Sequence, residues 1–291
     1  MLIGRWVPGF LACVTAALFV VGVAGADNSV TFPDRVGDGG RSLDITGLQV
    51  DEGEGYIWFT VTFAHNPFCT GESGDLDSTI AIDTDQNPDT GSAFYGTEYE
   101  LSFAAGTSGE GEPQFLRANG WDFKRIDAPV AWGCGPTADA YGVAASDLGL
   151  APDAGFNVVA AVMSAHPDTA PDIRTFNFQP VPGRLPPPLG PDRRAPHVIA
   201  FSASGVHGRL VRLSYWALDG RGRTVDTIRV YRGNRLLKTI RRTLGDTNPF
   251  DTSHVTWRVP ENVRGRLRFS VRSADAAGNA STPTWARLVI H

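Results

Sequence analysis

An acidic turn after residue 82 has the residue types and spacing of a cation-binding loop. Oxygen-bearing side chains stand at alternate positions, at Asp83, Asp85, Asn87 and Asp89. Alternating Asp and Asn residues in a turn bring several oxygens round one point, and such oxygens are the ligands that Ca²⁺ prefers. The alternative is an acidic turn whose side chains hydrogen-bond their own backbone. The loop is not an EF-hand, because Pro88 stands where that motif requires glycine.

No catalytic motif accompanies this turn. The sequence has neither a G-x-S-x-G nucleophile elbow nor an H-E-x-x-H zinc motif, and its histidines are scattered through expected loops and strand ends. A carboxylate pair for glycoside hydrolysis stays open, because the separation of such a pair is spatial and not sequential. We expect a protein that is not an enzyme.

The first 26 residues have the pattern of a signal peptide. Arg5 supplies a positive charge, residues 10–23 are apolar, and Ala24-Gly25-Ala26 is a cleavage site of the A-x-A type. The apolar run is short for a bilayer span and has no stop-transfer flank. We expect a secreted, extracellular protein that begins near Asp27 and has no transmembrane segment after processing.

Cleavage would leave two cysteines, Cys69 and Cys134. A single pair in an exported chain predicts a disulfide. It would close a loop of about 66 residues and stabilise the fold by roughly 4 kcal/mol in the chain-entropy model. Redox or metal-ligating thiols are the alternative, but no C-x-x-C motif supports them.

Charge and proline content divide the remaining chain into two domains. Residues 27–191 hold 7 Lys/Arg and 24 Asp/Glu, whereas residues 192–291 hold 18 Lys/Arg and 7 Asp/Glu. Residues 180–194 are rich in proline, which favours an extended polyproline spacer. We therefore expect domains at 27–179 and 195–291, joined by this linker.

Short segments that alternate apolar and polar residues predict an all-β protein. In the first domain they include residues 42–50, with a register change near Gly47, and residues 56–63. Asn119-Gly120 is a hairpin signal, and only residues 145–150 suggest a short helix. Such a pattern is typical of a jelly-roll-type β-sandwich.

The acidic motifs of the first domain carry a family resemblance. Asp34-x-x-x-Asp38 followed by Leu43-Asp44-Ile45, and then the 82–91 loop and Gly96-Thr97-Glu98-Tyr99, resemble the DOMON-like superfamily, which includes family-9 carbohydrate-binding modules. The resemblance spans roughly residues 28–179. It implies a β-sandwich that binds sugar or another small ligand, often with structural Ca²⁺. It adds Asp34, Asp38 and Asp44 to the candidate calcium ligands.

Aromatic residues in loop-like sequence are the candidates for contact with a sugar ring. These are Phe94, Tyr95, Trp121 and Trp132, whereas Trp58 lies in an apolar strand and is expected in the core. The alternative for each loop aromatic is a plug over the end of the sandwich.

The second domain reads as an immunoglobulin-like β-sandwich. Seven short strands fit into about 100 residues, and Asp275-x-x-Gly278-Asn279 resembles a turn of bacterial immunoglobulin-like or fibronectin type III-like modules. We expect Trp216 and Trp257 in its core. Many arginines alternate with apolar residues and would share one strand face. That face could bind an anionic cell-envelope polymer, dock on the acidic domain, or be merely solvated; no motif indicates nucleic-acid binding.

Two functions from different classes follow. The first is a non-catalytic binding protein, with a calcium-stabilised sandwich that recognises carbohydrate or a cell-envelope polymer. The second is a structural or adhesive cell-surface protein without a small ligand. A third possibility is the accessory region of an exported hydrolase.

Overall fold

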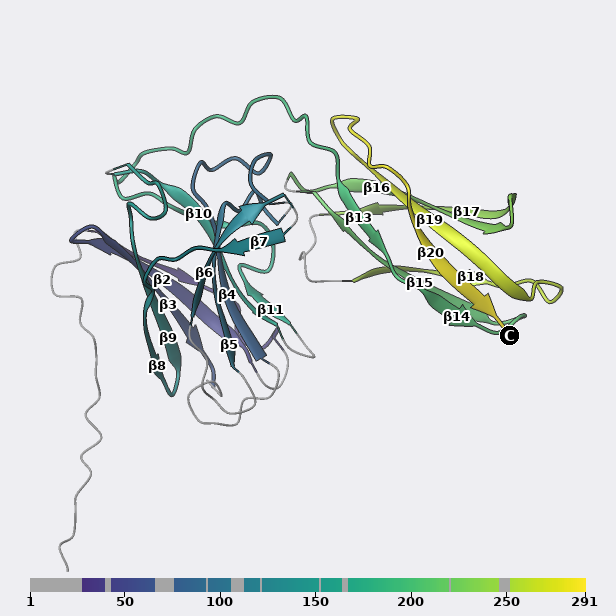
Figure 1. The fold of residues 1–291 in the computed structure, drawn as a ribbon, viewed down its shortest axis with the longest axis horizontal. Helices are drawn as coiled ribbons and strands as arrows, with labels where there is room; N and C mark the ends of the chain where they lie inside the picture. Colours follow the sequence, from purple (N-terminus) through teal and green to yellow (C-terminus); the bar gives the residue numbers. More distant parts are fainter. Residues whose placement is uncertain are drawn as a thin grey trace, which may run out of the picture.

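The computed structural model describes most of the chain after residue 27, and the residues that it describes form β-strands and no helix. They are residues 28–39, 43–65, 76–92, 94–105, 113–120, 122–151, 153–163, 167–219, 221–245 and 252–291. Two β-sandwiches are joined by a linker that arches over one end of both (Figure 1). The predicted all-β fold with two sandwich domains is confirmed.

The first sandwich consists of two antiparallel sheets. In spatial order, one sheet contains β1 (Asn28–Pro33), β2 (Ile45–Gly53), β3 (Tyr56–Phe63), β9 (Ala138–Ala144) and β8 (Ala131–Gly135). The other contains β11 (Asp168–Ala170), β10 (Phe156–Met163), β4 (Leu76–Asp83), β5 (Tyr99–Ala105), β6 (Gln114–Asn119) and β7 (Asp122–Arg125), and β12 (Phe176–Phe178) pairs with β10. The chain passes between the sheets after β3, β7 and β9.

Alternation along the strands builds the core of this sandwich. In β3 the side chains of Ile57, Phe59, Val61 and Phe63 are buried, and the residues between them face outward. They pack against the inner face of the second sheet, where Phe156 lies 5.8 Å from Phe59 between ring centroids. Burial of apolar area stabilises the fold by roughly 25 cal/mol per Å².

Two local predictions are confirmed and one is wrong. The pairing of β2 with β3 shifts register between Ile45 and Gly47, as the bulge prediction required. The hairpin between β6 and β7 turns at Gly120, where φ is +71°. Residues 145–150 form turns and not a helix, because Asp147 and Gly149 donate three residues back, and six residues are too few to offset helix nucleation.

The second sandwich consists of two sheets, and its first four strands fall alternately in one sheet and the other. A three-stranded sheet contains β13 (His197–Ala200), β15 (Leu210–Leu218) and β18 (Ser253–Arg258). A five-stranded sheet contains β14 (Ala203–Gly205), β20 (Thr284–Ile290), β19 (Gly265–Asp275), β16 (Thr224–Arg232) and β17 (Arg235–Leu244). Trp257 is in the core as expected, whereas Trp216 is only half-buried and meets Phe201 edge-on.

A carboxylate lies inside this second core. Asp226 is fully buried and accepts hydrogen bonds from the hydroxyl groups of Tyr215 at 2.8 Å, Ser273 at 2.6 Å and Thr224 at 3.2 Å. Three donors satisfy a buried carboxylate that would otherwise be costly, so this network ties β15, β16 and β19 together.

Several sequence predictions fall on residues outside the described ranges. These include the signal peptide at 1–26, Trp121 and Cys69, so export and the disulfide to Cys134 stay predictions. Residues 180–194 contain no strand. Within the described ranges there is no helix that is long and apolar enough to cross a membrane.

Candidate functional site

The acidic turn brings three carboxylates together at one end of the first sandwich. Asp83 ends β4, Asp85 follows it, and Glu98 stands before β5, where its amide donates to the carbonyl of Ile82. One carboxylate oxygen from each acidic residue lies within 4.8 Å of the others. Oxygens on opposite sides of a Ca²⁺ ion are roughly 4.8 Å apart, so this spacing is compatible with one ion.

Hydrogen-bond acceptors outnumber donors in this cluster. The hydroxyl of Thr90 has one hydrogen but lies 3.0 Å from both oxygens of Asp85, 3.0 Å from Glu98 Oε1 and 2.8 Å from the carbonyl of Asn87. Burial, followed by the charge of Glu98, raises the pKa of Asp83 to about 8, although a hydrogen bond from Asn157 opposes the rise. The cluster therefore favours a proton or a metal cation.

A chain of side-chain amides connects this cluster to neighbouring strands. Asn157 Nδ2 donates to Asp83 Oδ2 at 2.9 Å, and Asn177 Nδ2 donates to Asn157 Oδ1 at 2.8 Å. Gln179 Nε2 donates to Asn177 Oδ1 at 3.0 Å and to Gln86 Oε1 at 3.1 Å. Because each amide is held by the next, the array is fixed before any ligand arrives.

The amide array opens into a cleft between the two sandwiches. The cleft has a volume of about 570 Å³, within the range of small-molecule sites. Its lining includes polar groups from the first sandwich and apolar side chains of the linker. It is lined by Asp83, Gln86, Pro88, Tyr95, Asn157, Ile173, Arg174, Thr175, Asn177, Pro186, Pro187, Leu189, Leu218, Asp219, Arg221 and Gly222.

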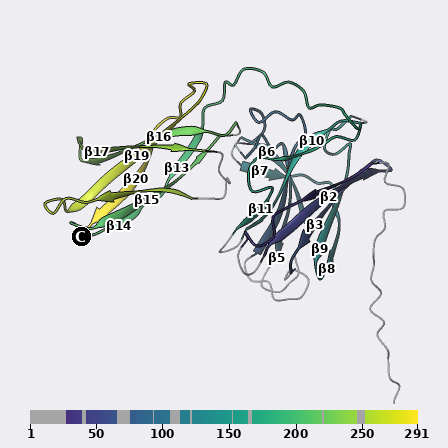
Figure 2. The ribbon, with the colours of Figure 1, turned by 180° about the vertical axis from the view of Figure 1, so that it is seen from behind.

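Two arginines contact the acidic turn beside this cleft, Arg194 from the end of the linker and Arg221 from the second domain. Arg221 forms a bidentate ion pair with Asp89, with Nε at 2.9 Å and Nη2 at 2.5 Å. Arg194 donates to the carbonyls of residues 88, 90, 91 and 92 at 2.6–3.3 Å. Both views of the fold show this end of the first sandwich facing the second (Figure 2). The sequence did not mark either arginine as a candidate contact.

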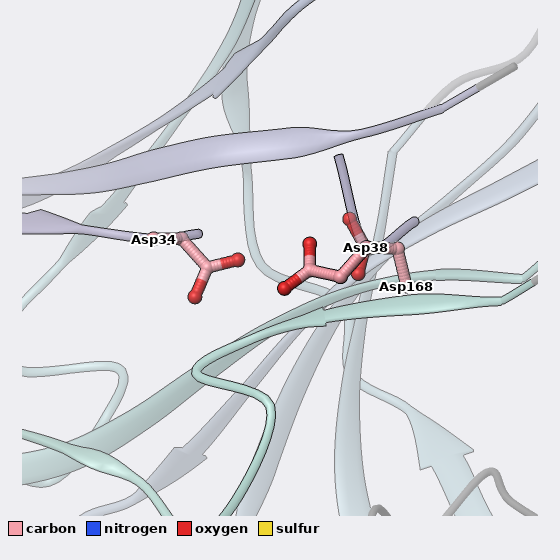
Figure 3. Close-up of side chains that lie close together, drawn as sticks. All are labelled: Asp34, Asp38 and Asp168. Atoms are coloured by element: carbon pink, nitrogen blue, oxygen red, sulfur yellow. The ribbon is translucent and has the colours of Figure 1, made fainter. Parts of the chain in front are cut away.

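A second acidic cluster lies elsewhere on the first sandwich. Asp34 and Asp38 belong to the connection between β1 and β2, and Asp168 begins β11. Figure 3 shows the carboxylates of Asp34 and Asp38 pointing toward one another beside Asp168. One oxygen from each lies within 4.8 Å of the others. The chain at Gly39 passes so close that a Cβ there would lie 2.5 Å from Asp168 Oδ2.

Electrostatic repulsion marks this second cluster as well. Burial, followed by the charges of Asp168, Asp172 and Asp38, raises the pKa of Asp34 to about 7. The Oδ2 atom of Asp34 is buried, and no residue in the described part of the chain hydrogen-bonds to it. Burial also raises the pKa of Asp168 to about 6, although the amide of Ile45 donates to it. An unsatisfied buried carboxylate oxygen among other carboxylates fits a hard divalent cation.

A third acidic group lies at the base of the second domain. Asp192, Asp219 and Asp275 have oxygens within 4.8 Å of one another. Asn279 Nδ2 already bridges them, with donation to Asp275 Oδ2 at 2.8 Å and to Asp192 Oδ1 at 3.4 Å. This group is therefore a weaker candidate for a cation.

The predicted calcium ligands divide between two places. Asp34 and Asp38 lie in one cluster, and Asp83 and Asp85 lie in the other. The remaining predicted ligands are used differently. Asp44 accepts from the amides of residues 37 and 39 at 2.8–3.1 Å, Asn87 Oδ1 accepts from the amide of Asp89, and Asp89 pairs with Arg221.

The predicted aromatic contacts do not form one surface. Tyr95 lines the cleft and accepts a hydrogen bond from the amide of Arg174. Phe94 packs on Tyr95 with 5.4 Å between ring centroids and does not line the cleft. Trp132 is exposed on β8 and packs against Phe103, so it lies apart from the cleft residues.

The expectation that Trp58 is a core residue is wrong. It faces outward from β3 and is half-buried, because the indole lies flat over Gly142 on the neighbouring strand β9. A Cβ at Gly142 would approach the indole to 2.8 Å. Only glycine leaves room for this contact.

Sequence reasoning missed the residues that complete each cluster. Glu98 joins the first one through the pairing of β4 with β5, and its place in the Gly96-Thr97-Glu98-Tyr99 motif was a usable signal. Asp168 lies far from Asp34 in the chain, and no local pattern marks it. The amides Asn157 and Asn177 also meet only through strand pairing.

Comparison with known proteins assigns no family to this chain. No protein-family model matches the sequence, and no curated protein matches it. A PKD domain of an M14-like peptidase from Thermoplasmatales archaeon SCGC AB-540-F20 is 13% identical, with 33% of this chain and 92% of that chain covered and a TM-score of 0.22. The fibronectin(III)-like modules of Clostridium thermocellum CbhA are 12% identical, with 72% and 93% covered and a TM-score of 0.24. A chimeric titin Z1Z2 tandem is 11% identical, with 81% and 91% covered and a TM-score of 0.23. None of these three is described as a DOMON-like protein, and at TM-scores of 0.22–0.24 they carry no argument about the family of this chain. Likeness at this level carries no information about a ligand.

Proposed function

We propose that this protein is an exported, non-catalytic binding protein whose interdomain cleft takes a small neutral carbohydrate. The observation that carries the proposal is the cleft, whose lining combines amides of a hydrogen-bonded array with an aromatic ring and prolines. A side-chain amide has both donors and acceptors, as a sugar hydroxyl does, so the two are complementary.

The cleft has the other features that sugar recognition requires. Tyr95 offers a ring for the apolar face of a pyranose, and the linker residues Pro186, Pro187 and Leu189 add apolar surface to the lining. Because both domains and the linker line the cleft, a bound sugar would also hold the domains together. The DOMON-like resemblance of the first sandwich agrees with a sugar ligand.

We also propose that Ca²⁺ binds the two acidic clusters of the first sandwich. Asp83, Asp85 and Glu98 would hold one ion, and Asp34, Asp38 and Asp168 another. The ion near Asp83 would keep that carboxylate charged, so that it continues to accept from Asn157 and anchors the amide array. Calcium would thus act on the cleft through structure and not through contact with the sugar.

Binding to a glycan array with Ca²⁺ and with EDTA, followed by calorimetric titration of the best ligand, tests the proposal. We expect saturable binding that the substitution Tyr95→Ala weakens at least tenfold and that Tyr95→Phe largely keeps. Tyr56→Ala, at an exposed tyrosine on β3 outside the cleft, is the matched control.

Absence of saturable sugar binding with and without Ca²⁺ would overturn the carbohydrate proposal. A structural or adhesive role would then be the better explanation, with the two sandwiches as spacers. Export is tested separately, because the amino-terminal residue of protein recovered from culture medium should be Asp27.

A further inference from the structure

The outer face of the five-stranded sheet in the second domain gathers six arginines. Strand pairing places them on one side, because Arg268 lies opposite Arg287 on β20 and Arg272 lies opposite Thr227, which in turn lies opposite Arg241 on β17. All six are exposed. The basic face consists of Arg229, Arg241, Arg266, Arg268, Arg272 and Arg287.

No carboxylate balances this charge within the sheet. Its strands carry two acidic residues, Asp226 and Asp275, and both are buried. None of the six arginines forms an ion pair with another residue that the structure describes. An exposed guanidinium without a counter-charge is available to an external anion, and it matches carboxylate, sulfate and phosphate groups in a bidentate manner.

An aromatic pair stands among these arginines. Trp285 is 46% exposed, and its ring centroid lies 5.3 Å from that of Tyr231. The guanidinium of Arg268 sits 4.5 Å from the Trp285 centroid and 5.9 Å from that of Tyr231. These rings hold the arginine in place, so less side-chain entropy is lost when it binds an anion.

We propose that this basic face binds a linear acidic polysaccharide. The backbone positions of Arg268 and Arg287 are neighbours across two strands, at about 4.8 Å, and those of Arg266 and Arg268 are alternate residues of one strand, at about 6.7 Å. Side chains at such positions can meet successive anionic groups of one polymer. The exposed side of Trp285 offers a surface on which a sugar ring stacks.

The geometry favours an acidic glycan over a nucleic acid. The described part of the second domain has no helix that could protrude from this face into a duplex groove. Single-stranded nucleic acid is held by several successive aromatic platforms, whereas one indole is exposed on this face.

The face is separate from the interdomain cleft. The second domain reaches the cleft through Leu218, Asp219, Arg221 and Gly222, and none of these residues belongs to the basic face. The acidic first domain is likewise held by Arg194 and Arg221 and leaves the basic face uncovered. Failure of sugar binding in the cleft would therefore leave this proposal intact, and the reverse also holds.

Binding of the full chain to immobilised heparin and to alginate oligosaccharides, with neutral dextran as the negative control, tests the proposal. We expect binding to both polyanions at 50 mM NaCl that weakens steeply with salt, as counterion release requires. The double substitution Arg268→Gln/Arg287→Gln should lower affinity at least tenfold, and Trp285→Ala at least threefold.

The matched control removes two arginines from the other sheet of the same domain. Arg212 and Arg258 are exposed on β15 and β18, so Arg212→Gln/Arg258→Gln changes the net charge equally. Affinity within twofold of the unsubstituted protein supports the proposal. An equal loss in both double variants, no binding to either polyanion at 50 mM NaCl, or tighter binding to single-stranded DNA than to the glycans would overturn it. Melting temperatures confirm that each variant is folded.

Discussion

The substitution Asp34→Asn should stabilise the calcium-free protein and remove one calcium site. In the absence of a cation, Asp34 is held beside Asp38 and Asp168 with one oxygen buried and unpartnered. An asparagine amide at that position carries no charge. Its NH₂ group can donate to the neighbouring carboxylates, so repulsion is replaced by a hydrogen bond.

The pKa of Asp34 sets the magnitude. A rise from 3.8 to about 7 corresponds to roughly 4 kcal/mol at 1.36 kcal/mol per unit. Because Asp34 is only half-buried, solvent screening reduces this to about 2 kcal/mol. At pH 8 in EDTA we therefore expect the melting temperature of the first sandwich to rise by about 4–8 °C.

Calcium should reverse the order of stability. Saturation of one site at 100 times its dissociation constant adds about 2.7 kcal/mol to the unsubstituted protein. The variant should bind one Ca²⁺ fewer per chain and lose that increment. Differential scanning calorimetry with EDTA and with Ca²⁺ gives the stabilities, and isothermal titration gives the number of ions bound.

The exposed residue Asp127 provides the control, because Asp127→Asn removes the same charge outside either cluster. It should change neither the melting temperature in EDTA nor the calcium stoichiometry. If Asp34→Asn lowers stability in EDTA, or binds as many ions as the unsubstituted protein, then this cluster does not hold a cation.

Three further predictions follow from other parts of the structure. In EDTA the first sandwich should lose stability as pH rises from about 4 to 8, because the pKa values of Asp34 and Asp83 are raised to about 7 and about 8 in the folded state. Thermal scans at pH 5 and pH 8 measure this loss, and Ca²⁺ should abolish it. Arg221→Met leaves Asp89 partly buried without its partner, which should weaken the contact between the domains by about 1.4 kcal/mol. A protease should then cleave the linker about tenfold faster. Arg223→Met, at an exposed arginine, is the control, and equal cleavage rates for the two variants would refute the role of the ion pair. Tyr215→Phe removes one of three hydroxyl donors to the buried Asp226, so it should lower the free energy of unfolding of the second domain by about 1.5–3 kcal/mol, as measured in urea. A loss under about 0.5 kcal/mol would contradict a stabilising role for this network.

The sequence determined the fold class because its cause is local. Alternation of apolar and polar residues, as in Tyr56–Phe63, is itself the physical condition for a strand with one buried face. The bulge at Gly47 and the turn at Gly120 were readable for the same reason, since each depends on a few neighbouring residues.

Strand pairing decided what alternation could not. Trp58 and Phe59 are neighbours in an apolar run, and alternation places them on opposite faces of β3. The pairing of β3 with β9 brings Gly142 beside Trp58, where the missing side chain leaves room for the indole, and residues 56–63 do not reveal that contact.

The candidate sites divide in the same way. The sequence by itself identified Asp83 and Asp85, and a family resemblance added Asp34 and Asp38, because short motifs encode turns that gather oxygen atoms. Only the tertiary structure supplied Asp168 and Glu98, turned Asp89 toward Arg221, and opened a cleft between the domains. Carboxylates and amides act through distances of a few Å, and strand pairing and domain contact set those distances between residues that are remote in the chain.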